Sequence, residues 1–201
     1  MGAKEMLDGM KIKEVSVENY LSTTYTYPVY TMVDVEDYNS KKDGSAFDKK
    51  DFYANPQNYN SNFERFTEVS DIFIAGHFYG NGAPVILSIE MLASPKCKIK
   101  VVADISCDID GPIACTLKAS TIADPNYGYL PSDHKEVDMF HPSAIVVMAV
   151  DNLPCELPKD ASEGFGEMFT QHVIPAFFNN DANGVLERAK ITENGRLTPR
   201  F

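Results

Sequence analysis

Three short stretches of this sequence combine carboxylate, imidazole and amide side chains with residues that form turns. They are GHFYGNG after Ala75, DISCDIDG after Ala103 and DNLPCELP after Val150. Each follows an apolar run of the length of a buried strand, namely DIFIAG, KIKVVADIS and AIVVMAV. Polar groups at such places can bind ribose hydroxyls, orient a cationic amine or move protons. The spacing therefore predicts a ligand site built from three strand ends.

The acidic stretch DISCDIDG places Asp104, Asp108 and Asp110 at the mouth of one strand. These carboxylates either contact a ligand or cap the turn that follows, and their spacing leaves both readings open. In DNLP, Asn152 offers a neutral amide that could bond a carboxamide, with a simple turn as the alternative.

The apolar runs indicate the elements that must carry these residues. We expect strands at 11–15, 27–35, 71–76, 98–106 and 144–150. Helices are expected near the N-terminus, at 63–69 and 84–93, from Pro158 to a break or kink at Pro175, and at about 183–191. Strand–helix alternation with strands that are apolar on both faces predicts an α/β doubly wound, mostly parallel sheet with C-terminal helices. In such sheets ligands bind at the carboxyl ends of the strands.

Two segments raise separate questions. The chain opens with a helical pattern, MGAKEMLDGM, that has no capping residue, so either a preceding loop is absent or the first turn is frayed. Residues 36–62 form a polar insertion with a helical turn expected at 49–54, and it is either a functional flap or surface decoration.

Composition restricts the classes of partner. The 201 residues carry a net charge of −11. With no local Lys/Arg cluster, this charge argues against nucleic acid and anionic membranes as partners. The longest apolar run has seven residues, at 144–150, which is far short of a membrane span. No secretory pattern is visible, so we expect a soluble, cytoplasmic protein.

The cysteines and histidines give no sign of a metal site. No C-x-x-C or HExxH spacing occurs, and reduced, packed thiols are favoured over two disulfides. SCDIDG looks superficially like a calcium loop. It fails because Ser106 would occupy the first ligand position and Leu117 the bidentate one. We therefore expect no structural metal.

Four motifs in order resemble one known family. ADISCDIDG, STIADPNYG, AVDNLPCELPKDASEGFGEMF and ERAKITENGRL are similar to segments of the family of lysine-forming saccharopine dehydrogenase and lysine–ketoglutarate reductase. They resemble alanine dehydrogenase more distantly. The resemblance runs from about residue 71 to the C-terminus and is loose across 11–66.

The resemblance implies a Rossmann-like domain over 1–155 that binds NAD or NADP, and a helical segment over 156–201. It implies an oxidoreductase that acts on saccharopine-like amino acids as its small-molecule substrate. It also implies that the first strand and the catalytic domain, with its acid–base Lys and His, lie upstream of Met1. On this reading 156–201 would pack on that domain and the chain alone is inactive. The alternative is a non-catalytic nucleotide-binding or oligomerisation module.

The family's roles carry over to nine positions. Gly2 matches the third glycine of the dinucleotide fingerprint. The turn that passes the cofactor's ribose and pyrophosphate matches Gly76 and His77. The strand end beneath the nicotinamide ribose matches Asp104, Ile105 and Asp108. The loop behind the nicotinamide matches Asp151, Asn152 and Leu153. Asp108 also matches an active-site Asp of alanine dehydrogenase, so it is the one catalytic candidate. For the acid that binds the adenine ribose, Glu14 and Glu18 both remain possible.

A missing first strand has a consequence for assembly. In a Rossmann sheet the first strand lies between the second and the fourth. Its absence would leave the runs at 11–15 and 71–76 each with an unpaired edge. Because exposed edges pair between chains, we expect a homo-oligomer.

Overall fold

The protein is described from a computed structural model of residues 2–77, 79–80 and 82–201. The chain divides into two compact units, one ending at Asp151 and one running from Asn152 to Phe201.

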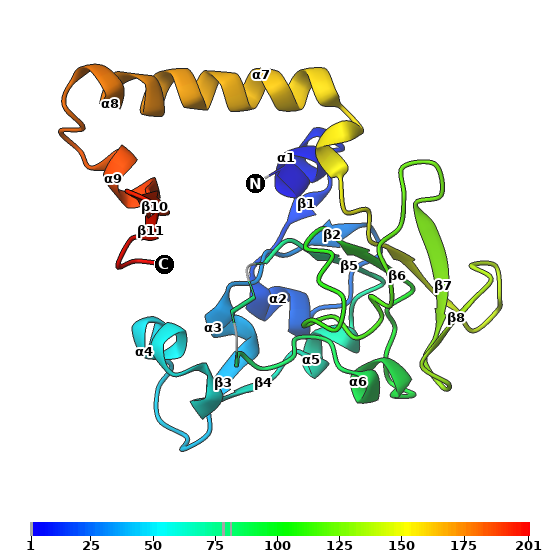
Figure 1. Cartoon of the computed structure of the whole chain (residues 1–201). Coiled ribbons are helices and arrows are strands. Elements are labelled where there is room, and N and C mark those ends of the chain that lie inside the picture. Colours follow the sequence, from blue (N-terminus) through cyan, green and yellow to red (C-terminus); the bar gives the residue numbers. More distant parts are fainter. Residues whose placement is uncertain (1, 78, 81) are drawn as a thin grey trace. The chain divides into compact units, whose positions relative to one another are not determined.

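A five-stranded mixed sheet forms the centre of the first unit (Figure 1). The strand order is β5 (Ile72–Ala75), β6 (Val101–Asp104), β9 (Ile145–Met148), β7 (Asn126–Leu130) and β8 (Lys135–Val137). The first three run parallel, whereas β7 is antiparallel to both β9 and β8. The predicted α/β class with C-terminal helices is confirmed, and the sheet is consistent with a Rossmann-like fold. The antiparallel pair β7–β8 was not expected from the sequence.

One face of this sheet carries the core. Ala75, Val102 and Val147 are completely buried on it, together with Asp104. On the other face of β5, Ile72 and Ile74 are exposed. The residues of β5, β6 and β9 are apolar on both faces, as expected. Within the first unit, however, more buried and less buried residues alternate along each of these strands.

The N-terminal segment adds a separate pair of short parallel strands. It contains α1 (Gly2–Gly9), β1 (Lys13–Glu14), α2 (Val17–Ser22) and β2 (Val29–Tyr30). Only two residues of each strand predicted here pair with one another. Tyr30 ties the segment together: its hydroxyl donates to Asp8 and accepts from Lys4, which also binds Glu14.

The polar insertion is folded. It contains α3 (Val35–Tyr38), β3 (Asn39–Lys41), α4 (Lys49–Ala54), the 3₁₀ turn η1 (Pro56–Asn58) and β4 (Tyr59–Ser61), with β3 antiparallel to β4. The helix expected at 49–54 is confirmed, and Asp48 caps it. The rings of Phe47, Phe52 and Tyr59 pack on one another at centroid distances of 5.1–5.5 Å, which gives the insertion a small aromatic core.

Two short helices cover the core face further along. They are α5 (Glu64–Thr67) and α6 (Ile89–Ala93). The helix expected at 84–93 begins only after Ser88, whose hydroxyl accepts from the Met91 amide. The preceding residues are extended because Leu87 pairs with Ile113 instead.

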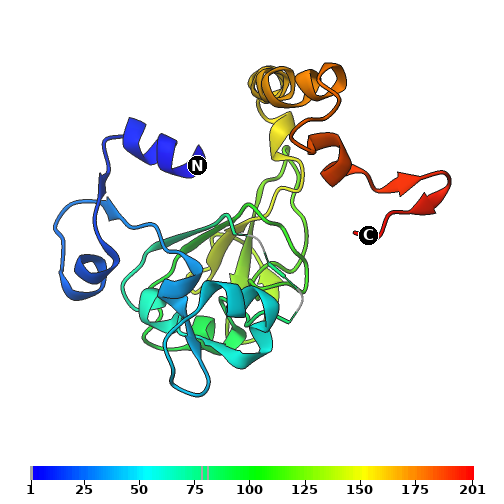
Figure 2. The same ribbon diagram turned by 90° about the vertical axis from the view of Figure 1, so that its left-hand side faces the viewer.

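The second unit is a run of helices that ends in a hairpin (Figure 2, yellow to red). Its elements are the 3₁₀ turn η2 (Leu153–Cys155), α7 (Pro158–Met168), the π-helical turn η3 (Phe169–Val173), α8 (Ile174–Phe178), α9 (Val185–Ala189), β10 (Thr192–Glu193) and β11 (Arg196–Leu197). The break expected at Pro175 is a switch to π-helical geometry just before that proline, which cannot donate to the preceding turn. Asn194 and Gly195 have positive φ and form the hairpin turn.

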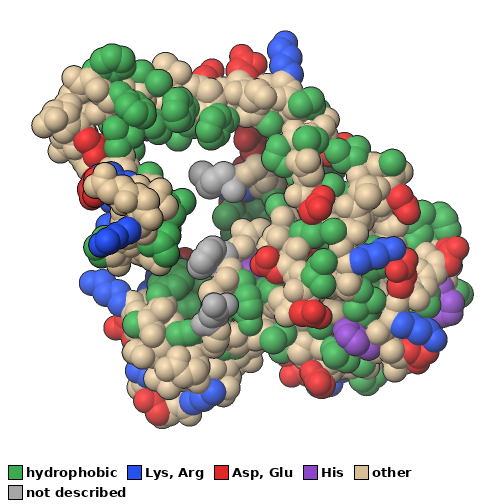
Figure 3. Space-filling view, viewed as in Figure 1, with side chains coloured by type: hydrophobic (Ala, Val, Ile, Leu, Met, Phe, Trp, Pro, Cys, Tyr) green, Lys and Arg blue, Asp and Glu red, His purple; other side chains and the backbone are tan. Residues whose placement is uncertain are grey.

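Apolar side chains lie exposed along α7 and α8, as the green atoms of Figure 3 show. They include Phe165, Met168, Phe177 and Phe178. Among the residues that the structure describes, no helix combines the length and hydrophobicity needed to cross a membrane.

Candidate functional site

The carboxyl ends of the parallel strands lie at one edge of the sheet. Ala75 at the end of β5 is in register with Asp104 at the end of β6, and Ala103 with Met148 of β9. The predicted segments that begin at Gly76 and Ile105 therefore start side by side. The Ile105 amide donates a 2.9 Å hydrogen bond to the Ala75 carbonyl, which joins them.

Asp104 supports this edge from inside. Its side chain is completely buried. One carboxylate oxygen accepts from the Ser106 amide and hydroxyl at 3.1 and 2.6 Å, and the other accepts from the Thr116 hydroxyl at 2.6 Å. Of the two readings open for these carboxylates, Asp104 fits the turn-capping one.

Asp108 has a different environment. Its side chain is exposed, and its carboxylate accepts no hydrogen bond from any described residue. The turn after it is closed by its backbone, because the Gly111 amide donates to the Asp108 carbonyl at 2.9 Å. A Cβ on Gly111 would lie 2.6 Å from the Cβ and carbonyl oxygen of Asp108, so only glycine fits there. Asp108 is thus positioned by a tight turn while its carboxylate remains free to meet a ligand.

The backbone of this turn is strained. Cys107 and Asp110 have φ values of 50° and 57°, in the left-handed region that residues with a Cβ seldom adopt. Such strain persists only where surrounding contacts impose it, and it is concentrated at functional sites.

One of the contacts that hold the turn comes from Cys107. Its thiol donates a 3.0 Å hydrogen bond to the Ala149 carbonyl just beyond β9. Burial raises the pKa of this thiol, and the charges of Asp104, Asp151 and Asp108 add to the effect. The thiol therefore stays protonated and remains a hydrogen-bond donor.

His77 carries the least satisfied group of the site. Its Nε2 atom is buried without a hydrogen-bond partner among the described atoms. Burial lowers the pKa of His77, and the charges of Asp104 and Asp108 partly oppose this. Buried ring nitrogens normally have a partner, so an orphan of this kind indicates that a water or ligand belongs there.

The two glycines predicted to lie at the cofactor have open surroundings. A Cβ on Gly2 or Gly76 would meet nothing within 4 Å among the described atoms. Neither position shows the close approach that requires glycine, so the cofactor roles of both residues remain predictions.

The third predicted segment is divided between the units. Asp151 is the last residue of the first unit and is exposed. Asn152 and Leu153 open the second unit, where the Asn152 carbonyl accepts from the Cys155 amide at 3.0 Å. The Asn152 side chain makes no capping hydrogen bond to η2. Its predicted role behind the nicotinamide likewise remains a prediction.

The residues that hold the turn in place were missed from the sequence. Thr116 lies twelve positions beyond Asp104, and no local pattern links them. Among the described residues, including those of the candidate site, no three His, Cys, Asp or Glu side chains form a group that could hold a metal ion.

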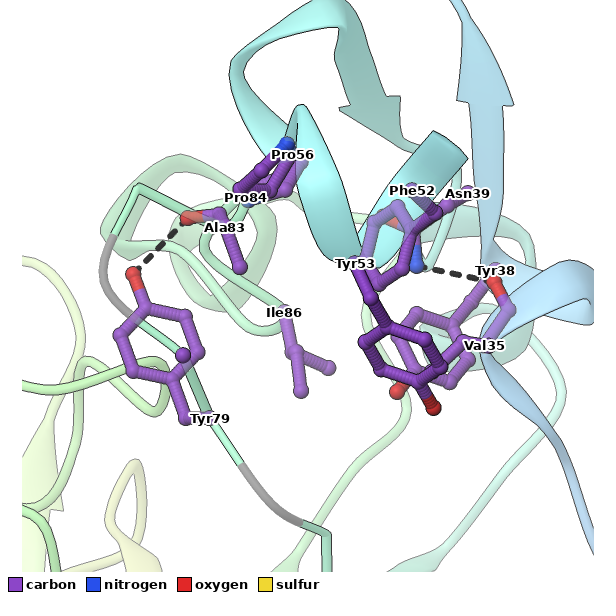
Figure 4. Close-up of a pocket in the computed structure, with 11 residues that line it drawn as sticks. Val35, Tyr38, Asn39, Phe52, Tyr53, Pro56, Tyr79, Ala83, Pro84 and Ile86 are labelled. Atoms are coloured by element: carbon purple, nitrogen blue, oxygen red, sulfur yellow. Dashed lines mark hydrogen bonds between the residues drawn. The ribbon is translucent and has the colours of Figure 1, made fainter. Parts of the chain in front are cut away.

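A pocket of about 180 Å³ was also missed, and it lies between the insertion and the loop after His77 (Figure 4). Four aromatic rings line it, those of Tyr38, Phe52, Tyr53 and Tyr79. The other lining residues are Val35, Asn39, Pro56, Gly80, Ala83, Pro84 and Ile86. The tyrosines scattered through the polar insertion are the only signal for it in the sequence.

Known proteins match nearly the whole chain, although no family model does. The chain is 32% identical over 201 residues to alpha-aminoadipic semialdehyde synthase of Arabidopsis thaliana, and the match covers 96% of this chain and 19% of that protein. It is 26% identical over 224 residues to the mitochondrial alpha-aminoadipic semialdehyde synthase of Rattus norvegicus, covering 98% and 24%.

A shorter relative extends the comparison to a second kind of protein. The chain is 33% identical over 130 residues to the NAD(+)-dependent, L-lysine-forming saccharopine dehydrogenase of Schizosaccharomyces pombe, covering 62% of this chain and 33% of that protein. The chain thus spans between 19% and 33% of the length of these three relatives. The family resemblance seen in the sequence is confirmed. The chain is a homologue of the alpha-aminoadipic semialdehyde synthases and of lysine-forming saccharopine dehydrogenase, and it corresponds to a part of those proteins.

Proposed function

We propose that this chain supplies the nicotinamide-nucleotide-binding part of an oxidoreductase that acts on the C–N bond of saccharopine-like amino acids. The observation that carries the proposal is the orphaned Nε2 of His77 at the carboxyl edge of the parallel strands, close enough to the free Asp108 carboxylate for its charge to raise the pKa of His77. Ligands gather at that edge in open α/β sheets. The homology to lysine-forming saccharopine dehydrogenase supplies the class of reaction.

The residues present fit NAD or NADP by their chemistry. The Asp108 carboxylate can accept hydrogen bonds from ribose hydroxyls, and Nε2 of His77 can bond a hydroxyl or a phosphate oxygen. Ile105, which is exposed next to them, offers an apolar surface to a ring. When bound, the cofactor supplies or accepts a hydride. On this proposal Gly76 and His77 lie at its ribose and pyrophosphate, Ile105 and Asp108 lie beneath its nicotinamide ribose, and the buried Asp104 supports the turn that carries Asp108.

At the other half, Glu14 and Glu18 are both candidates for the acid that binds the adenine ribose. Glu14 ends β1, and Glu18 lies in the first turn of α2. Because β1 pairs only with β2 among the described strands, the strand order does not distinguish the two acids. Glu14 already binds Lys4, and this pair would have to share or exchange partners when a cofactor binds.

Turnover on this proposal needs further polypeptide. The family's acid–base Lys and His match no residue of this chain, and losing such a pair costs on the order of 10²–10⁴-fold in rate. We therefore propose that the chain alone binds the cofactor and turns over little or no saccharopine. The cytoplasmic location expected from the sequence remains a prediction.

A second candidate function is a subunit-interaction module, and the edge of β5 favours it. The Asp71 and Ala75 carbonyls accept hydrogen bonds from the side of β6. In a parallel ladder, the peptide groups of the intervening Ile72 and Ile74 therefore point away from β6. Both residues are also exposed. An apolar edge of this kind is a template for a strand from another chain.

Calorimetric titration with NADH and NADPH tests the proposal. We expect wild type to bind at least one of them and Asp108→Asn to weaken binding about ten- to a hundredfold, as for the loss of a charged hydrogen bond. Asp124→Asn is the matched control, because this exposed Asp lies in another loop. If neither cofactor binds at millimolar concentration, the interaction module becomes the better reading. Saccharopine oxidation by the chain alone at about 1 per second or faster would refute the need for further polypeptide.

A further inference from the structure

We propose that the aromatic pocket between the insertion and the loop after His77 binds the aminopurine ring of an adenine nucleotide. This rests on the proposed function, because a nicotinamide dinucleotide is the adenine nucleotide in question. On this proposal the polar insertion is part of a ligand site and not surface decoration.

The pocket has a buried floor and more exposed walls. Tyr38 and Phe52 are 7% and 6% exposed and form the floor, whereas Tyr53 is 59% exposed. In Figure 4, Tyr53 and Tyr79 stand on opposite sides of Ile86. The Tyr79 hydroxyl donates a 2.9 Å hydrogen bond to the Ala83 carbonyl, which fixes the orientation of its ring. The geometry offers flat ring faces to an inserted planar group.

The lining selects a neutral ligand. It contains no Lys, Arg, His, Asp or Glu among the eleven residues that form it. Burial raises the pKa of Tyr38 to about 12, so its hydroxyl stays neutral at physiological pH. Phosphates, carboxylates and ammonium groups would lose their hydration here without gaining a charged partner. Purine rings, in contrast, gain by stacking on aromatic side chains.

Asn39 adds a polar group to the lining. It is 5% exposed, and its amide nitrogen donates a 2.9 Å hydrogen bond to the Val35 carbonyl. Among the described residues, no donor reaches its side-chain carbonyl oxygen. An exocyclic amino group on the ring would supply one, and adenine carries such a group where hypoxanthine carries a carbonyl. The combination of stacking faces and a free acceptor favours an aminopurine.

Size and position agree with one ring and not a whole nucleotide. The volume of about 180 Å³ lies below the ~300–1,000 Å³ typical of sites that enclose an entire small ligand. The ribose and phosphates must therefore continue outward. Tyr79 lies two positions after His77, so a single loop leads from the strand-end site to the pocket.

Titrations with parts of the cofactor test the proposal. We would measure the binding of NADH, AMP and nicotinamide mononucleotide, which lacks adenine, to the wild-type chain and to Tyr53→Ala. Loss of stacking should weaken NADH and AMP about five- to a hundredfold and leave nicotinamide mononucleotide unchanged. Tyr53→Phe should bind like wild type. Tyr27→Ala removes another exposed tyrosine, 51% exposed and outside the pocket, and serves as the control. Circular dichroism checks that each variant is folded.

The outcomes separate the two proposals. Unchanged AMP and NADH affinity in Tyr53→Ala overturns the pocket proposal and leaves the proposed function standing. Tyr53-dependent binding of AMP without any binding of NADH or NADPH supports the pocket and counts against the proposed function. If wild type binds none of the three compounds, both are wrong. IMP, which replaces the amino group by a carbonyl, should bind more weakly than AMP, because it cannot donate a hydrogen bond from that position to the side-chain carbonyl of Asn39.

Discussion

The hydroxyl of Thr116 donates a 2.6 Å hydrogen bond to the carboxylate of Asp104, and both side chains are buried. This bond fixes the end of β6 beneath the turn that carries Asp108. A buried carboxyl group depends on each of its hydrogen-bond donors.

Replacing Thr116 by Val therefore tests the support of the site. The change keeps the shape of the side chain and removes one donor from Asp104. We expect the free energy of unfolding to fall by about 1–3 kcal/mol. Urea denaturation measures it, with Thr24→Val at an exposed position as the control. Equal loss in both variants would show that Asp104 does not depend on this bond.

The pKa of His77 should depend on the charge of Asp108. Burial holds the pKa of His77 below its ordinary value, while the charge of Asp108 raises it. Asp108→Asn should therefore lower the pKa of His77 further. NMR titration of the imidazole protons provides the measurement. A rise in the His77 pKa on this substitution would contradict the proposed proximity.

The lowered pKa of His77 also makes the free energy of unfolding depend on pH. A base whose folded pKa lies below its unfolded value of about 6.5 binds fewer protons in the folded state. The contribution of neutral His77 is thus fully present above about pH 6.5 and is lost as pH falls through the folded pKa. His77→Gln should remove this part of the pH dependence of the melting temperature. A pH profile that is identical in wild type and variant would exclude it.

The contacts of Asp51 should stabilise the insertion at neutral pH and be lost in acid. Its carboxylate binds Lys41 at 2.8 Å and accepts from Asn55 and Tyr59, each at 2.9 Å. Hydrogen bonds from Lys41, Asn55 and Tyr59 lower its pKa to about 2. Their stabilisation is complete above the unfolded pKa of about 3.9 and is lost as pH falls through 2.

We expect the insertion to loosen between about pH 4 and 2 while the sheet remains folded. Amide hydrogen exchange across 39–61 would follow it. Asp51→Asn should give the loosened state already at neutral pH. Asp43→Asn is the control, because Asp43 bonds only to Ser45 within its own turn. If residues 39–61 of Asp51→Asn exchange their amide hydrogens as slowly as wild type at pH 7, Asp51 does not stabilise the insertion.

The edge of β5 should mediate association between copies. Light scattering at micromolar concentration should report a dimer or larger species. Ile74→Lys should shift it toward monomer, because a charge on an edge strand opposes pairing. Ile122→Lys changes a residue of similar exposure, 43% against 37%, in a loop, and should have no effect. A wild-type chain that stays monomeric would refute this use of the edge.

The sequence was sufficient to predict the parallel strands but not their partners. The runs that end at Ala75, Asp104 and Met148 are apolar, so their sequence favours a strand that packs into the core over other conformations. In β7 and β8 the pattern is weaker: NYGYL contains Asn and Gly, and KEV is largely exposed. These strands form because Tyr127 and Tyr129 pack into the core, which only the folded chain reveals.

At the candidate site, the spacing of the motifs predicted that the segments after Ala75 and Ala103 lie together, which the Ile105–Ala75 hydrogen bond confirms, but it could not assign a role to each residue. Asp104 and Asp108 have the same chemistry in the sequence, and the fold distinguishes them, because Ser106 and the distant Thr116 both donate to Asp104. The expected helix at 84–93 failed in its first half for a similar reason, because Leu87 found a bridge partner at Ile113. Long-range contacts of this kind leave no local pattern.

The π-helical turn Phe169–Val173 resets the angular phase of the helix that follows. An α-helix advances about 100° per residue, so one extra residue in a turn delays everything after it by about 100°. Phe165 and Phe169 stack with ring centroids 5.8 Å apart. In an uninterrupted α-helix Phe177 would lie about 80° around the axis from Phe169; with the delay it lies within about 20°. Straightening this turn into an α-helix without removing a residue would therefore rotate Phe177 to about 80° from Phe169, whereas deleting one residue would keep the two rings within about 20° of one another.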